Sequence, residues 1–346
     1  MDTLQKSFDK AMQELAAAAG SEEERRQISA DVPHRMENLL SKYPSEMLAG
    51  LKVNAERGLA ERRKLHAEFV DRNTSRWKEG FDLLELQIEI SIEAGDSFTR
   101  RLRPKATAEG DLVFDLLVRL QAKGILVAKE ILTLLKNGYA DGAHGRWRSL
   151  HEMTVTAMFM LAHGQEAARR YLDHESVDAY RAALQLEKFV SRLNTPGFSE
   201  GELAQLKARY DAVLDAYGKD FANAYGWARP FLGKGNPNFL SMEEAVGLDH
   251  LRPYYMWASQ NVHASAKTIK TSLGLSETVS EALQVGPSNS GMTDPAHSTA
   301  ISLSQLTITL LRLAPNLDDS VMMKVLLLLT DEIGQAFVRC SENPIA

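Results

Sequence analysis

The sequence predicts an all-α fold, a multi-helix bundle core with an N-terminal arm of amphipathic helices. Apolar residues recur at three- and four-residue intervals along nearly the whole chain, and few segments alternate apolar and polar residues. Stretches rich in glycine, proline or asparagine interrupt this pattern and mark the expected helix ends. These breaks fall at residues 100–110, 193–202, 228–241 and 284–298.

Residues 1–104 are expected to form the arm, and residues 105–346 the helical core domain that carries the candidate site. Dense charge in AERGLAERRKLHAEFVDRNTSRWKEG favours long helices with one solvated face, suited to packing on a partner. The joint is expected in RRLRPKATAEG, which contains Pro104 and Gly110.

Two core helices have clear ends. One runs from Leu112 to Leu135, with Lys136 in its last turn and a glycine stop after it, and another begins after Ser199 as N-cap. The stretch 284–298 has two interpretations, a lid over a functional site or a polar connector that leads into the next helix.

Composition excludes several classes of protein. The chain has 346 residues and a formal charge of -6, which argues against a general nucleic-acid coat and against a polybasic membrane binder. Cys340 is the single cysteine, so neither an intrachain disulfide nor a CxxC site can form. Neither an export signal nor a bilayer-spanning segment is recognisable, and we expect a cytoplasmic location.

The stretch YADGAHGRWRSLHEMTVTAMFML, residues 139–161, predicts a helix with Asp141 as N-cap. Helical spacing places four ionisable residues on one arc, while Arg146 points elsewhere. These four residues are His144, Arg148, His151 and Glu152. The uncharged run after them is expected to be buried, so the polar residues need partners: one another, distant acids or a bound anion. A structural tether, with Arg148 paired to Glu152, is the simpler alternative.

A second helix is expected over RPYYMWASQNVHASAKTIK, residues 252–270. Its spacing aligns Tyr255, Ser259, His263 and Lys267 on one stripe. If the two helices face each other, they form one pocket of titratable groups. The catalytic candidates are then His151, Arg146, Arg148 and His263, and the substrate-binding or supporting candidates are His144, Glu152, Tyr255, Ser259, Asn261 and Lys267.

Several kinds of active site are disfavoured. Ser259 lacks the GxSxG turn of a serine hydrolase, the chain has no Glu-x-x-His pair for a dimetal site, and it has no GxxxxGK[ST] phosphate loop. We therefore expect neither a metal nor another cofactor.

Four stretches in order, GYADGAHGRWRSLHE, YLDHESVDAYRAAL, SQNVHAS and GPSNSGMTDPAHSTAISL, resemble the bacterial family called domain of unknown function 5677. The resemblance covers about residues 75–315. It implies a helical, bacterial and cytosolic protein, and some such proteins are expected to serve in defence against phage.

A more distant resemblance is to HEPN ribonucleases, whose Arg-x4-6-His motif cuts RNA without metal, commonly across a dimer interface. Arg146 and His151 fit this spacing, although Trp147 stands where a polar residue often follows the arginine. The resemblance implies that His151 is the acid or base, that Arg146 or Arg148 clamps the phosphate, and that His263 is a second proton carrier.

Two functions follow as expectations. The first is a metal-independent ribonuclease in bacterial anti-phage or toxin defence, with RNA guided by cations and with a second copy or another defence protein as partner. The cations are Arg62, Arg63, Lys64, Arg100, Arg101, Arg103 and Lys105. The alternative is a non-catalytic helical binding or regulatory protein with an Arg/His pocket that holds an anion or tethers helices.

Overall fold

The computed structural model describes residues 3–233, 235–263, 266–268, 270–277 and 283–342. Within these ranges α-helices and short 3-10 turns are the only regular elements, which confirms the all-α prediction. The helices are α1 (Thr3–Ala18), α2 (Glu22–Arg76), α3 (Lys78–Glu109), α4 (Leu112–Lys136), α5 (Ala140–Glu187), α6 (Val190–Leu193), α7 (Glu200–Tyr217), α8 (Phe239–Val246), α9 (Arg252–Val262), α10 (Thr293–Leu311) and α11 (Leu317–Glu342).

The chain divides into two compact units, residues 1–68 and 69–346. This division lies at residue 68 and not at the expected residue 104. Helix α3 continues through Pro104 to Glu109, and Gly110, with the left-handed φ of 64°, is its C-cap. The part of α3 before Pro104 packs into the core with Phe81, Leu84 and Phe98 fully buried. Pro104 thus lies inside α3 and does not end the helix.

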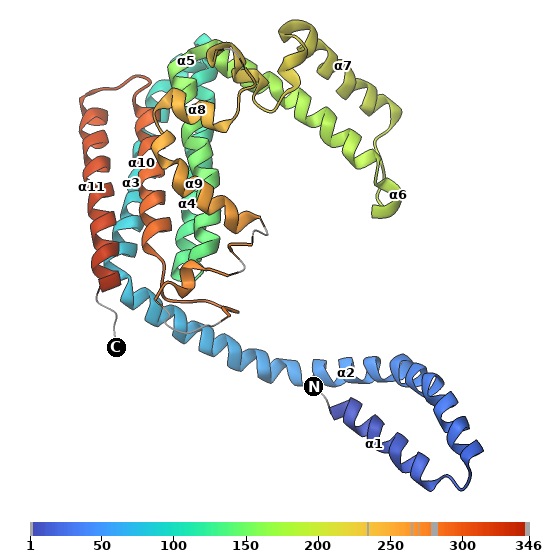
Figure 1. Ribbon diagram of the computed structural model, residues 1–346. Coiled ribbons are helices and arrows are strands. Elements are labelled where there is room, and N and C mark those ends of the chain that lie inside the picture. Colours follow the sequence, from blue (N-terminus) through green and yellow to red (C-terminus); the bar gives the residue numbers. More distant parts are fainter. Residues whose placement is uncertain (1–2, 234, 264–265, 269, 278–282, 343–346) are drawn as a thin grey trace. The chain divides into compact units, whose positions relative to one another are not determined.

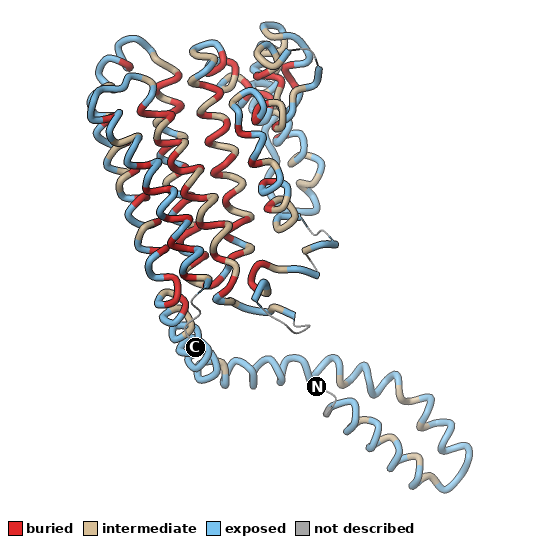
Figure 2. Tube along the Cα trace, turned by 60° about the vertical axis from the view of Figure 1, so that its left-hand side comes forward, coloured by how far each residue is buried: buried red, intermediate tan, exposed pale blue. Residues whose placement is uncertain are grey.

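The unit of residues 1–68 consists of α1 and most of α2. Nearly all its residues are exposed (Figure 2), including long apolar side chains such as Leu40, Met47 and Leu51. The helices expected for this unit are present, but the expected single solvated face is not, because α2 is exposed on all sides up to residue 68.

The unit of residues 69–346 is a bundle of α3, α4, α5, α10 and α11, which lie side by side (Figure 1). Their buried residues face one another across the bundle (Figure 2). Helices α8 and α9 pack against α5, and α7 packs against α5 as well. Gly164, with φ of 69°, bends α5 at a backbone conformation that favours glycine.

Both predicted helix starts are present. The Asp111 carboxylate accepts a hydrogen bond from the Phe114 amide at 2.9 Å and caps α4, which spans the predicted apolar run. Ser199 caps α7 in a capping box with Glu202. Residues 228–241 contain a 3-10 turn and the start of α8 but no long helix, as expected.

Close packing of α4 and α10 depends on Gly124. A Cβ at this position would lie 2.2 Å from Leu306 Cδ2 and 3.2 Å from Leu150 Cδ1, and both leucines are buried. Overpacking a filled core costs about 1–3 kcal/mol. Helices α5 and α10 therefore approach α4 closely at Gly124, which has no side chain.

We predict that Gly124→Ala lowers the free energy of unfolding by about 1 kcal/mol or more despite alanine's better helix propensity. Gly142→Ala in α5 is the matched control, because its nearest neighbouring atom would lie 3.8 Å away. It is expected to change stability by less than about 1 kcal/mol, in the stabilising direction. Urea unfolding curves compare the two variants, and equal stabilities would contradict the prediction.

Candidate functional site

The start of α5 is tied to a distant turn by Asp141. The predicted N-cap role is wrong, because α5 begins at Ala140 and Tyr139 is the capping residue. The Asp141 carboxylate instead accepts hydrogen bonds from Ser272 Oγ at 2.5 Å and from the Leu273 amide at 3.0 Å. An acid in the first turn of a helix is also favoured by the helix dipole.

His144 lies fully buried between two tryptophans. Its ring stacks on Trp147 at 5.7 Å between centroids and meets the edge of Trp257 at 5.3 Å. Neither ring nitrogen has a hydrogen-bond partner among the described residues. Burial lowers the pKa of His144 to about 4, against the opposing effect of Asp141. The ring is therefore neutral at pH 7.

His151 is fully buried and bonded to an equally buried acid. Its Nε2 lies 2.9 Å from Oε1 of Glu243 in α8. The other oxygen of Glu243 accepts a hydrogen bond at 2.7 Å from Nη1 of Arg252, the first residue of α9. One carboxylate thus joins α5, α8 and α9, and both its oxygens are occupied.

Arg148, Glu152 and Tyr255 form a neighbouring, partly exposed group. Arg148 Nη2 donates to Glu152 Oε1 at 3.0 Å and to Tyr255 Oη at 2.7 Å. The Tyr255 hydroxyl donates to Glu152 Oε1 at 2.5 Å. Burial and then this carboxylate raise the pKa of Tyr255 above its ordinary value. The Arg148–Glu152 pair anticipated from helical spacing is present.

Arg146 points toward α4, away from this group. Its Nε lies 2.5 Å from Glu130 Oε2, and its Nη1 donates to Ser149 Oγ at 3.0 Å. Trp147 is fully buried and donates through Nε1 to Ser302 Oγ of α10 at 2.9 Å. The spacing between Arg146 and His151 therefore does not correspond to a shared pocket in the structure.

The second predicted helix is shorter than expected. Helix α9 ends at Val262, and His263 follows in an extended conformation with φ of -108° and ψ of 144°. His263 is exposed whereas His151 is fully buried, and no contact joins them among the described residues. Lys267 is also outside the helix, with its Nζ 5.8 Å from the centroid of the Trp257 ring.

Two further candidates lie near the end of α9. Ser259 Oγ donates to the Tyr255 carbonyl at 2.6 Å, so this hydroxyl is engaged with its own helix. Asn261 lies where α9 approaches Gly145 of α5, and its buried Nδ2 has no partner among the described residues. Of the expected stripe, Tyr255 is the one residue that hydrogen-bonds to the ionisable arc of α5 in the part of the chain that the structure describes.

We call seven residues that surround the α5–α8–α9 contact the polar cluster: His144, Arg148, His151, Glu152, Glu243, Arg252 and Tyr255. Sequence reasoning missed Glu243 and Arg252. The sequence indicated only that cations beside a buried helix need acids from elsewhere in the chain. Spacing along α5 could not indicate which acid among many would supply the charge.

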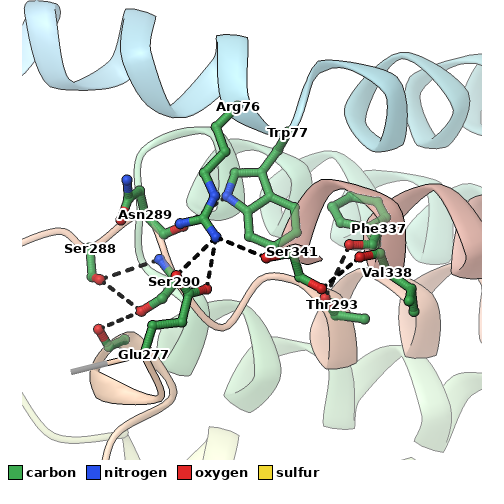
Figure 3. A network of polar contacts seen from close by, with 11 residues as sticks. Arg76, Trp77, Glu277, Ser288, Asn289, Ser290, Thr293, Phe337, Val338 and Ser341 are labelled. Atoms are coloured by element: carbon green, nitrogen blue, oxygen red, sulfur yellow. Dashed lines mark hydrogen bonds and ion pairs between the residues drawn. The ribbon is translucent and has the colours of Figure 1, made fainter. Parts of the chain in front are cut away.

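The segment 284–298 is only partly a loop, because α10 begins at Thr293. The Asn289 carbonyl accepts hydrogen bonds from Arg76 Nη1 at 2.9 Å and Trp77 Nε1 at 2.8 Å (Figure 3). Arg76 also contacts both carboxylate oxygens of Glu277 (Figure 3). These contacts favour the connector interpretation over the lid.

The fold and the cluster define an all-α bundle in which buried ionisable side chains join three helices. Residues 114–279 match the model of a family described as a family of unknown function, DUF5677. The resemblance to this family is thus confirmed over these residues, which contain the whole polar cluster. Neither a curated protein nor a solved structure matches the chain.

Two features are absent from the part of the chain that the structure describes. Helices with the length and apolar content to cross a membrane were not found there. Groups of three or more histidine, cysteine, aspartate or glutamate side chains placed to hold a metal ion were not found there either.

We predict that His151→Ala lowers the free energy of unfolding by about 2–4 kcal/mol, because it leaves a cavity and removes a partner of buried Glu243. His263→Ala is the control, expected to change stability by less than about 0.5 kcal/mol since the side chain is exposed. Thermal or urea unfolding measures both. Similar losses in the two variants would contradict this assignment.

We predict a pH dependence of stability that originates at His144. Its pKa is about 4 in the folded state against 6.5 as the ordinary value, so the unfolded chain binds more protons between these values. The contribution of His144 to the free energy of unfolding is fully present above pH 6.5, and it falls by up to about 3 kcal/mol as the pH drops toward 4. The free energy of unfolding of His144→Leu, measured by urea unfolding at each pH, should depend less steeply on pH in this window than that of wild type. The control variant His263→Leu should keep the wild-type pH dependence.

Proposed function

We propose that the chain is a non-catalytic helical binding or regulatory protein in which the polar cluster tethers helices. The burial of His151 carries this proposal. A general acid or base must come within hydrogen-bond reach of the substrate proton. The His151 ring is fully buried, and its Nε2 is bonded to Glu243, so a bound RNA would have to displace α8 to meet it.

The arginines support the same proposal. Arg146 is paired with Glu130, Arg148 with Glu152 and Arg252 with Glu243. A clamp for a phosphate or another anion needs guanidinium donors that are available to the ligand. Here an acid of the chain already accepts from each of these three, which favours the tether over the anion pocket.

Of the four cations at residues 100–105 that were proposed to guide RNA, all but Arg103 form an ion pair with an acid among the described residues. Arg100 pairs with Asp96, Arg101 with Asp319, and Lys105 with Glu109. Such exposed pairs add little stability, but they reduce the positive potential that would attract a phosphate backbone. The formal charge of -6 acts in the same direction.

The unit of residues 1–68 supplies a binding surface of a different kind. Charged residues and exposed apolar side chains alternate around its helices, a composition that suits contact with another protein. We assign it the assembly role expected of the arm. The ribonuclease function and the defence setting stay predictions from resemblance.

The test is incubation of purified protein with mixed RNA in EDTA, beside His151→Ala and His263→Ala. We expect intact RNA in all three samples. Circular dichroism checks that each variant is folded. Expression in cells tests whether the protein becomes toxic when a cellular trigger or partner is present. Cleavage by wild type that is lost in either folded variant would overturn the proposal and favour the ribonuclease.

A further inference from the structure

The outward face of α11 carries several exposed apolar side chains among exposed polar ones such as Ser320, Glu332 and Gln335. Five side chains there are largely exposed: Leu317 at 79%, Val321 at 57%, Leu327 at 49%, Leu328 at 65% and Val338 at 45%. The opposite face of the same helix packs on α3 and α10 through Leu326, Ile333 and Phe337. Single exposed apolar residues are ordinary, whereas a row along one helix marks a contact surface.

Two opposite charges flank the centre of this row. Lys324 and Asp331 are both exposed, and helical spacing places them on the same side of α11, two turns apart. Neither forms an ion pair with another described residue, whereas Lys78 pairs with Asp82 and Arg339 with Glu79 nearby. Asp331 also acts electrostatically on His297. The row therefore offers one exposed cation and one exposed anion, on either side of Leu327 and Leu328 along the helix.

We propose that α11 pairs with α11 of a second copy of this chain in antiparallel orientation, about a two-fold axis between residues 327 and 328. This register sets Lys324 opposite the partner subunit's Asp331. It also sets Leu327 opposite the partner subunit's Leu328, and Leu317 opposite the partner subunit's Val338. Each of these pairs occurs twice because the two-fold axis repeats it.

The charge arrangement selects this occupant. A parallel pair of α11 helices would place Lys324 beside the same lysine and Asp331 beside the same aspartate. The antiparallel pair converts both repulsions into attractions, and charged residues at the edge of a helix pair commonly set orientation and partner choice in this way. The surface is complementary to itself, and it lies outside the polar cluster.

The contact is long enough to be specific. From Leu317 to Val338 the helix rises by about 30 Å at about 1.5 Å per residue. At about 100° per residue, Lys324 and Asp331 lie on the helix face between Leu327 and Leu328, so the charged pairs and the leucines meet together at the middle of the contact. The inference goes beyond the proposed function and does not depend on it.

Sedimentation velocity of the full chain over a range of concentrations tests the pairing. We expect a dimer for wild type and a rise in Kd of about tenfold or more for Leu328→Glu, since a charge would enter the centre of the contact. Leu126→Glu on α4 is the matched control, because Leu126 is 48% exposed and lies on another helix. It should dimerise as wild type does.

Reversing the charges at positions 324 and 331 gives a second test of the antiparallel contact. Lys324→Asp alone and Asp331→Lys alone should each weaken the dimer, and mixing the two variants should restore it as a heterodimer. The double variant should also dimerise, while circular dichroism confirms folding of every variant. A monomeric wild type, a dimer that survives Leu328→Glu, or single variants that mixing does not rescue would overturn the proposal.

Discussion

The carboxylate of Glu243 is the interaction on which the arrangement of helices around α5 depends. It lies fully buried, and it bonds to His151 on one side and Arg252 on the other. A buried charge without partners is costly, so α8 and α9 can dock on α5 only where both partners meet it. The apolar contacts of Phe239 and Tyr255 with the His151 ring then fill the surrounding space.

The function of this cluster follows from how its donors are used. Each arginine and His151 already holds an acid of the same chain, and His144 is a neutral ring between tryptophans. These pairs support the proposal that the ionisable residues at this helix contact hold the helices together. We propose that contacts with partners are made elsewhere, by the unit of residues 1–68 and by α11.

Much of the fold could be predicted because apolar periodicity and local caps are encoded over a few residues. The apolar run of α4, the Ser199 capping box and the Arg148–Glu152 pair all belong to this class. Glu243 could not be predicted as the partner of His151, because no local pattern reports a contact across 92 positions. The end of α9 at Val262 could not be predicted because residues 263–270 contain neither glycine nor proline, so no local signal marks it.

The shared carboxylate also imposes an order on folding. Glu243 and Arg252 are nine positions apart, whereas Glu243 and His151 are separated by 92. Closing the short loop costs far less chain entropy than closing the long one. The ion pair between α8 and α9 can therefore form early as a local contact, and His151 then meets a carboxylate that is already paired with Arg252.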